Sequence, residues 1–495
     1  MTPRQTIPIV LLAALATGLS GCPGHTRAAR QLQIDSFDRA WSRVQEVYPD
    51  PTMNGVDWEA AREEFRPRAE EATTAGALRP VLEEMFALLD TSHLEIIAGD
   101  LQATLAEAAE AARKTVHATS DSDSDSDSDP DPDPDSDPDP DSDPDPDPDP
   151  DPDPDPDDDD DDDGFGYGDV GLQLRLVGDQ VLVTDLDPDG PAAAAGVELG
   201  WLVTDIGGLD VAAFVPRVAE QMPDQRDREL RISMLVNGAL GGKAGRPLAL
   251  ALLDGDYQPV ELSIERRPPP REPVGFGHLP PSVVHSRDAL LDEGRVGYLW
   301  FDTFLMPAPQ LYTDAMVGFI EADVDGVVID VRGNPGGLVG MVRGMAGHLV
   351  GDKTSLGTMV YRDPTMGPVR LELRIAPRPA GQRFDGPVAI LVDRVTVSTG
   401  EVFAAGLQGI GRARVFGVQT PGMAMPSIIE ELPNGDSLQM PMGESLDPGG
   451  NRLEKDGVVP DEVVGLTREA YADGRDPVID AALAWLAEQR PAAAT

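Results

Sequence analysis

An acidic tract divides this chain and decides where folded structure can form. Residues 121–163 contain 25 Asp and no basic residue, alternating with Ser and Pro before a closing run of Asp. The whole tract, residues 119–163, has no apolar side chain to bury, and its like charges repel one another. We therefore expect it to be disordered and extended, with Pro stiffening it toward polyproline II. Folded domains are expected on either side of it.

Two roles fit such a tract. A solvated spacer is the interpretation we favour, because the composition offers no surface on which to build a core. The alternative is weak, multivalent Ca²⁺ association, since closely spaced carboxylates supply the oxygen ligands that Ca²⁺ prefers. The tract lacks the glycine turns of a defined calcium loop, so it predicts no particular ligand residue.

The charge of the chain argues against nucleic-acid binding. The 495 residues, enough for about two to four domains, carry a formal net charge of −49. The part outside the tract is acidic as well. Because phosphate contact needs a basic surface, we expect no nucleic-acid partner.

The first residues have the pattern of an export signal. Arg4 precedes an apolar stretch, residues 7–19, that is too short to span a bilayer as a mature helix, so residues 1–21 are expected to be a signal peptide. Cys22 follows directly, and as the only cysteine it has no internal disulfide partner. The run Leu-Ser-Gly-Cys resembles a bacterial lipobox, which implies lipidation at Cys22 and anchoring in the cell envelope, at its periplasmic face or the cell surface. The alternative is an ordinary signal peptide with a chance cysteine.

Residues 22–33 are expected to be a tether, and residues 34–118 a helical region. Apolar side chains recur at helical spacing in three stretches, which begin at Ile34, Trp58 and Leu78. Ser92 and His93 follow the third stretch, and a short strand is expected at residues 94–97. Residues 101–116 are Ala-rich and are expected to form a further helix.

Residues 164–266 are expected to form a small β-rich domain around one short helix. Its Ala-rich helix, residues 191–196, is followed by an apolar strand and a Gly-Gly pair. This pattern resembles a PDZ domain. The resemblance implies that the loop at Gly171 and Leu172 receives the carboxylate of a peptide, which adds to the sheet as a strand. The alternative is a PDZ-like fold that serves only as a packing or lid element.

Residues 271–490 alternate apolar strands with helices, which predicts an α/β layered fold. A proline run at residues 268–270 separates this region from the preceding domain. Strands are expected at residues 296–301, 326–330, 388–392, 413–417 and 437–441, and helices at 309–321, 337–350, 400–410 and 476–488.

Two turns in this region hold candidate catalytic groups. Residues 333–337, Gly-Asn-Pro-Gly-Gly, follow a strand and offer free backbone N–H groups. Ser398 lies at a second junction between a strand and a helix, where the helix N-terminus supplies N–H groups and a positive field. Glu401 in the first helical turn is interpreted as a helix-start residue rather than a catalytic one. A nucleophile beside preorganised donors is the minimum for acyl transfer.

Residues 30–100 and 165–465 resemble the peptidase family of carboxyl-terminal processing proteases and the tricorn core protease. The matching motifs are Asp-x-Arg-Gly-Asn-Pro-Gly-Gly, Ser-x-Gly-Glu and Gly-Val-Val-Pro-Asp, the last at residues 457–461. The resemblance implies an α/β, crotonase-like protease core with an N-terminal helical region and the inserted PDZ-like domain. It also implies polypeptide substrates and no metal or cofactor.

The family uses two catalytic designs. Processing proteases pair the serine with a lysine, but Met423 occupies that place here and cannot accept a proton. Tricorn-like members use Ser-His-Ser-Glu, and all four positions are filled. The resemblance therefore implies Ser398 as nucleophile, His93 as general base, Ser92 and Glu454 as the groups that fix the imidazole, and an oxyanion hole from the N–H groups of Gly336, Gly337 and Thr399.

Two alternatives stay open in this interpretation. Asp456 lies in the same charged run as Glu454 and is a candidate for its role. The chain as a whole is interpreted as a serine-type endopeptidase of the cell envelope. The rival is a catalytically inactive peptide-binding lipoprotein that keeps the fold.

Overall fold

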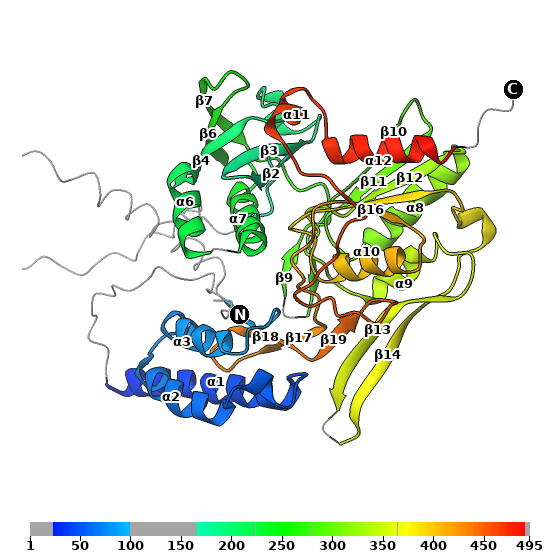
Figure 1. Cartoon of the computed structure of the whole chain (residues 1–495). Helices are drawn as coiled ribbons and strands as arrows, with labels where there is room; N and C mark the ends of the chain where they lie inside the picture. Colours follow the sequence, from blue (N-terminus) through cyan, green and yellow to red (C-terminus); the bar gives the residue numbers. More distant parts are fainter. Residues whose placement is uncertain (1–22, 100–165, 223, 278, 364, 491–495) are drawn as a thin grey trace, which may run out of the picture.

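The computed structural model describes residues 23–99, 166–222, 224–277, 279–363 and 365–490. They form an N-terminal helical domain, an inserted domain of residues 166–267, and a larger α/β core (Figure 1). The signal peptide, Cys22, the helix expected at residues 101–116 and the acidic tract lie outside the described residues. In the described part of the chain, no helix is both long enough and apolar enough to cross a membrane.

The N-terminal domain is a packed group of helices: α1 (Pro23–Val47), the 3₁₀ turn η1 (Met53–Gly55), α2 (Trp58–Glu71) and α3 (Ala75–Ala87). Asp57 and Thr74 cap α2 and α3 by accepting a backbone N–H with their side chains. The tether expected at residues 22–33 is wrong over most of its length, because α1 begins at Pro23. Ala, Arg, Gln and Leu dominate that segment, and all of them favour helix.

A strand fixes the N-terminal domain to the core. Strand β1 (Glu95–Ile97) pairs antiparallel with β18 (Ser437–Pro441), which pairs with β17 (Ser427–Glu431). Leu438 and Met440 of β18 are buried among the side chains of α1, α2 and α3. Arg79 of α3 forms a buried ion pair with Asp436, with a separation of 2.8 Å. Burying each such apolar side chain contributes roughly 1.5–3 kcal/mol, so these contacts stabilise the packing of the N-terminal helices on the core.

The inserted domain holds a sheet in the order β2-β3-β4-β6-β7, with β5 paired to β4. Its strands are β2 (Leu172–Val177), β3 (Gln180–Leu186), β4 (Leu202–Ile206), β5 (Leu209–Asp210), β6 (Pro247–Leu253) and β7 (Pro259–Glu265). The expected short helix is present as α5 (Pro191–Ala194). Two longer helices, α6 (Val211–Gln221) and α7 (Gln225–Leu240), were not expected from the sequence. Strand β2 lies at the edge of the sheet, and α7 packs against it.

The core is built on a sheet in the order β10-β11-β12-β15-β16-β20, parallel from β11 onward. Its strands are β10 (Ser286–Leu291), β11 (Val296–Phe301), β12 (Gly326–Asp330), β15 (Val388–Val392), β16 (Arg414–Gly417) and β20 (Glu462–Val463). The bounds of β11, β12, β15 and β18 are those expected from the sequence, and β16 begins one residue later. The predicted α/β class is confirmed.

Helices cover both faces of this sheet. Alternate residues of β12 and β15 face α8 (Ala308–Glu321), α9 (Gly340–Ala346) and α10 (Thr399–Gly409) on one side, and α12 (Pro477–Glu488) on the other. The helix expected at residues 337–350 is shorter, because the glycine turn continues to Val339. The remaining elements are β8 (Val274–Phe276), β9 (Leu279–Ser282), β13 (Thr354–Asp363), β14 (Gly367–Ile375), η3 (Ala380–Gln382), β19 (Gly443–Leu446) and α11 (Arg468–Ala472). Strands β13 and β14 form a long hairpin that extends away from the core (Figure 1).

The order of the strands brings the glycine turn, residues 333–337, next to the turn that holds Ser398. Strands β12 and β15 are parallel neighbours, with Ile329 opposite Ile390. The carboxyl ends of parallel strands meet at one edge of a sheet. The glycine turn follows β12 and the Ser398 turn follows β15, so the topology alone brings the turns to the same edge.

Candidate active site

The glycine turn and the serine turn are in direct contact. The N–H of Val397 donates to the carbonyl oxygen of Asn334 at 2.9 Å, and Thr399 Oγ1 donates to the carbonyl oxygen of Gly337 at 2.7 Å. A Cβ placed on Gly336 would lie 2.7 Å from Ser398 Cβ. Only a glycine allows this approach, and its φ of +106° is a second reason for glycine here.

Ser398 occupies a strained turn at the start of α10. Its backbone has φ 55° and ψ −117°, a conformation that is uncommon for a residue with a side chain. Its N–H donates to the carbonyl oxygen of Met423 at 2.8 Å and to Glu401 Oε2 at 3.1 Å. A serine on a sharp turn between a strand and a helix is presented outward at the helix N-terminus, where the field favours negative charge.

The donors for an oxyanion differ in part from those expected. The N–H of Gly336 donates to Asn334 Oδ1 at 2.9 Å, so in this structure it already has an acceptor. Across the described residues, the N–H groups of Gly337 and Thr399 have no acceptor. Gly337 and Thr399 belong to the two turns that meet at Ser398, since Thr399 Oγ1 donates to the Gly337 carbonyl oxygen. The glycine turn therefore supplies one free donor instead of two.

Ser92, His93 and Glu454 form a continuous hydrogen-bonded chain. Ser92 Oγ lies 2.8 Å from His93 Nδ1 and donates to Glu454 Oε2 at 2.8 Å. The N–H of Ser92 donates to Glu454 Oε1 at 3.0 Å, so the carboxylate holds both the backbone and the hydroxyl of Ser92. Since the hydroxyl proton points to Glu454, Ser92 Oγ accepts from Nδ1–H of the imidazole. This tautomer leaves Nε2 with its lone pair free.

Burial shifts the pKa values of His93 and Glu454. It lowers the pKa of His93 to about 4, which keeps the imidazole neutral near pH 7. Burial also raises the pKa of Glu454, although the hydrogen bonds from Ser92 and the nearby Lys455 oppose that effect. A histidine has to be neutral to accept a proton, and His93 is neutral near pH 7.

The loop of residues 420–425 connects the two halves of the site. Met423 accepts from the N–H of Ser398, and the N–H of Ala424 donates to Glu454 Oε2 at 3.4 Å. Among the hydrogen bonds of the described residues, none joins the His93 ring to Ser398. The loop of residues 420–425 therefore contacts both Ser398 and Glu454, while the His93 ring and the Ser398 hydroxyl are not hydrogen-bonded to each other.

Among the residues that the structure describes, no lysine takes the place that a Ser/Lys dyad would require. The Met423 side chain packs against an apolar cluster that includes Leu230 and Val397. Lys455 is near the site, but its Nζ lies 2.6 Å from Asp90 Oδ2, in an ion pair. An ammonium group held by a carboxylate does not accept a proton, so His93 is the candidate base among the described residues near Ser398.

Comparison with known families agrees with this geometry. Residues 295–464 match the family model of peptidase family S41, and residues 35–87 match that of the tricorn protease C1 domain. The chain carries a peptidase family S41 domain. The N-terminal helices that lead to Ser92 and His93 belong to the region that matches the tricorn model.

Two carboxyl-terminal-processing proteases are similar to this chain over its larger part. The protein of Picosynechococcus sp. is 24% identical over 308 residues, which cover 61% of this chain and 66% of the relative. That of Synechocystis sp. is 28% identical over 315 residues, which cover 62% of this chain and 65% of the relative. The matches thus span just under two thirds of the relatives' length.

A solved structure shares the fold at low sequence identity. Mature CPAF in complex with lactacystin superposes with a TM-score of 0.53 at 11% identity, covering 93% of this chain and 98% of that one. The α/β architecture, with its N-terminal and inserted domains, is therefore shared beyond the S41 domain itself.

Glu401 of the S41 domain has a larger structural role than the sequence suggested. It is fully buried, and its two oxygens accept from the N–H groups of Ser398, Gly422 and Met423, at 3.1, 2.8 and 2.9 Å, and from the Thr420 hydroxyl. Burial raises the pKa of Glu401 to about 7, against the effect of these hydrogen bonds. It fixes the 420–423 loop to the serine turn. The signal in the sequence was a serine followed three residues later by glutamate, the pattern of a capping box.

Asp393 and Arg175 support the glycine turn and were missed in the sequence. Asp393 accepts from the N–H groups of Gly333 and Val395 at 3.0 and 2.8 Å. Arg175 of β2 in the inserted domain donates to the same carboxylate at 2.9 Å. Burial raises the pKa of Asp393, but Arg175 and the Gly333 N–H more than offset that, and the pKa stays below its ordinary value. Through Arg175, the inserted domain therefore contacts the carboxylate that holds the glycine turn.

The peptide site expected in the inserted domain is occupied by the protein itself. The N–H of Gly171 donates to Asp169 Oδ1 at 2.7 Å, so it is not free to receive a carboxylate. Leu172 is buried and pairs with β3. At the edge of β2, Asn237 of α7 bonds both the N–H and the carbonyl oxygen of Leu174, at 2.9 and 2.8 Å. In this arrangement the N–H of Gly171 and the backbone of Leu174 already have partners within the chain, and peptide binding at Gly171 and Leu172 stays a prediction.

The described residues offer no metal centre. They contain no group of three or more His, Cys, Asp or Glu side chains close enough to hold an ion.

Proposed function

We propose that this protein is a serine-type endopeptidase, with Ser398 as nucleophile and His93 as general base. The observation that carries the proposal is the hydrogen-bonded chain from Glu454 through Ser92 to His93 Nδ1, which leaves Nε2 as a free base. Its partner is a strained serine turn flanked by two free N–H donors. The S41 family match supports the same reaction class.

The residues supply each step of acyl transfer. His93 Nε2 takes the hydroxyl proton of Ser398 as its oxygen attacks the substrate carbonyl. The oxygen of that carbonyl becomes negative and accepts from the N–H groups of Gly337 and Thr399. His93 then gives the proton to the departing amine. Water, activated by the same histidine, releases the acyl group from Ser398 and completes hydrolysis.

Glu454 and Ser92 make His93 competent for both proton transfers. Their hydrogen bonds hold the imidazole with its proton on Nδ1. When Nε2 takes the second proton, the carboxylate stabilises the imidazolium through Ser92. Catalytic hydrogen bonds are often long in substrate-free enzymes and shorten in the Michaelis complex, and we propose that the contact between His93 and Ser398 closes in this way.

We further propose polypeptide substrates and a position in the cell envelope. The relatives are carboxyl-terminal-processing proteases, which supports peptide bonds as the target. The signal-peptide pattern and Cys22 support lipid anchoring in the envelope. The rival function, a catalytically inactive peptide-binding lipoprotein, is less well supported because α7 occupies the β2 edge.

A fluorophosphonate probe on the purified full chain tests the function. The wild-type protein should be labelled on Ser398, and Ser398→Ala should take no label. Ser263→Ala is a matched control, because Ser263 is exposed on β7 of the inserted domain. An intact, folded wild-type protein that takes no label would contradict the proposal. For the anchor, Cys22→Ser should leave the chain unprocessed or released from membranes, and unchanged partitioning would refute it.

A further inference from the structure

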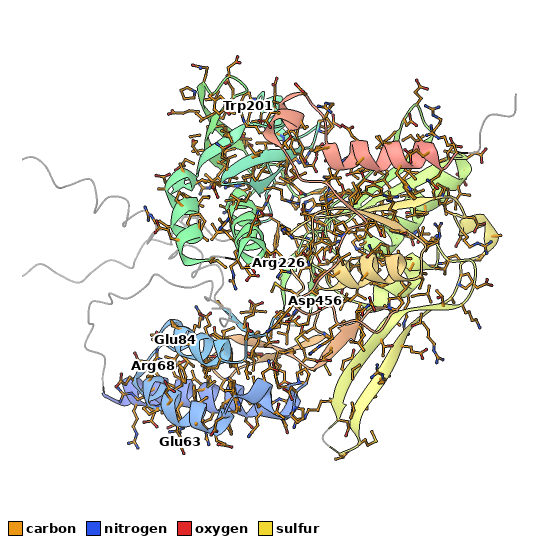
Figure 2. The ribbon with its side chains drawn as sticks, in the orientation of Figure 1. Glu63, Arg68, Glu84, Trp201, Arg226 and Asp456 are labelled. Atoms are coloured by element: carbon orange, nitrogen blue, oxygen red, sulfur yellow. The ribbon has the colours of Figure 1, made fainter. Side chains whose placement is uncertain are left out.

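Lys455, the residue after Glu454, is contacted by three separate parts of the chain. Its Nζ lies 2.6 Å from Asp90 Oδ2 of the N-terminal domain. Its N–H donates to the carbonyl oxygen of Gly422 in the core at 2.7 Å, and its own carbonyl oxygen accepts from Arg226 Nη1 of α7 at 3.2 Å. Figure 2 labels Arg226 and Asp456, the next residue after Lys455, near the place where the three parts meet.

The backbone around this junction is tightly constrained. Lys455 has φ 68° and Asp90 has φ 46°, both in the left-handed region that costs free energy for residues with a side chain. A Cβ placed on Gly422 would lie 2.6 Å from the Lys455 carbonyl carbon, so the two segments are packed against each other. Such strain persists only where surrounding contacts hold it.

Asp90 is itself held in place on the side of the N-terminal domain. Asn54 Nδ2 donates to the carbonyl oxygen of Leu89 at 2.7 Å and to the Tyr48 hydroxyl at 2.8 Å. Asp90 therefore presents its carboxylate from a fixed turn, two residues before Ser92. The ion pair joins that turn to the residue beside Glu454.

The ion pair is too exposed to serve mainly as a source of stability. The side chains of Lys455 and Asp90 are 43% and 33% exposed. Exposed pairs of this kind add little to the free energy of unfolding, because water already solvates both charges. The ion pair instead fixes the distance between the segment that carries Ser92 and the segment that carries Glu454, because it joins the two.

We propose that Lys455 is a positioning residue, which holds Glu454 against Ser92 and His93 by joining three parts of the chain through Asp90, Gly422 and Arg226. Lys455 touches neither the serine nor the imidazole, so it acts through Glu454. This inference rests on the proposed function, in which Glu454 orients the base.

Steady-state kinetics on a peptide substrate tests the proposal. Lys455→Met should lower kcat by ~10-fold to ~100-fold with KM unchanged, because a small displacement of a catalytic group costs that much rate. Lys455→Arg should restore most of kcat, since it keeps the charge and the length. Asp90→Asn should cost as much as Lys455→Met, and the double variant no more than either, as expected for two partners of one contact.

The ion pair between Arg68 and Glu84 provides a matched control. It joins α2 to α3 at 2.6 Å, with side chains 44% and 49% exposed, and Figure 2 shows both residues away from Asp456. Arg68→Met should leave kcat unchanged. A Lys455→Met variant with wild-type kcat, or one altered only in KM, would overturn the positioning role.

A second measurement separates this proposal from the proposed function. ¹⁵N-histidine NMR, with His93 assigned by substitution, reports which ring nitrogen carries the proton. The wild-type protein should show the Nδ1–H tautomer, Lys455→Met a mixture, and Lys455→Arg the wild-type state. An unchanged tautomer in Lys455→Met refutes the positioning role even if the protein proves to lack peptidase activity, and a missing fluorophosphonate label refutes the activity alone.

Discussion

Ser92 Oγ donates to Glu454 Oε2 at 2.8 Å although 362 residues separate the two in sequence. The contact joins the N-terminal domain to the S41 domain at the point where His93 is oriented. The N-terminal domain and the core are both required for it, because Ser92 follows α3 and Glu454 precedes β20. The proposed catalytic unit is therefore divided between two regions that sequence position alone would keep apart.

Glu454→Gln should lower kcat by ~10³-fold or more, because an amide beside Ser92 disturbs the tautomer of His93. Asp456→Asn is the matched control, since the sequence left Asp456 open for the same role. Of these two carboxylates, both among the described residues, only Glu454 has a hydrogen bond with Ser92, so Asp456→Asn should keep wild-type kcat. A loss of activity in Asp456→Asn equal to that in Glu454→Gln would contradict this assignment.

The pH dependence should reflect a histidine that stays neutral in mild acid. Burial lowers the pKa of His93 to about 4 from the ordinary value of 6.5, so the acid limb of kcat/KM should lie nearer pH 4 than pH 6.5. Across that window the unfolded chain binds a proton that folded His93 does not, so His93 makes the folded state less stable as the pH falls. Rates measured from about pH 4 to about pH 8 test this, and an acid limb at or above 6.5 would be inconsistent with it.

Glu401→Gln should weaken the serine turn and the fold together. The amide would place an NH₂ group against the N–H groups of Ser398 and Met423, which now donate to Oε2. A buried donor left without an acceptor costs about 1–3 kcal/mol in the free energy of unfolding. Denaturant unfolding measures that loss, with Glu488→Gln on the exposed end of α12 as control. Equal stability of the two variants would show that the contacts of Glu401 are dispensable.

Arg175→Met should reduce the rate of fluorophosphonate labelling by ~10-fold or more, because it leaves the buried Asp393 carboxylate without its cation beside the Gly333 N–H. Arg287→Met removes a partly exposed ion pair with Asp185 and should have little effect on labelling. A labelling rate in Arg175→Met equal to that of the wild type would exclude support of the oxyanion turn by the inserted domain.

The sequence predicted the central strands of the core because their apolar runs are long and end at clear turns. The resemblance to tricorn-like proteases, and not the residue patterns alone, predicted Ser92, His93 and Glu454, which the structure joins by hydrogen bonds. The sequence missed α6, which has Pro216 inside the helix, and α7, whose first two turns are mostly charged. Two hydrogen bonds could not be predicted from the sequence. Asn237 accepts from the Leu174 N–H of β2, and Asn334 Oδ1 accepts from the Gly336 N–H. Both depend on how the chain is folded in three dimensions, which residue patterns do not show.

The central claim is that His93 activates Ser398, and the rate of fluorophosphonate labelling at Ser398 tests it most directly. With the labelled residue identified by mass spectrometry, His93→Ala should label at least ~10³-fold more slowly than the wild type, while retaining a wild-type unfolding curve. Labelling of His93→Ala at the wild-type rate would contradict the account.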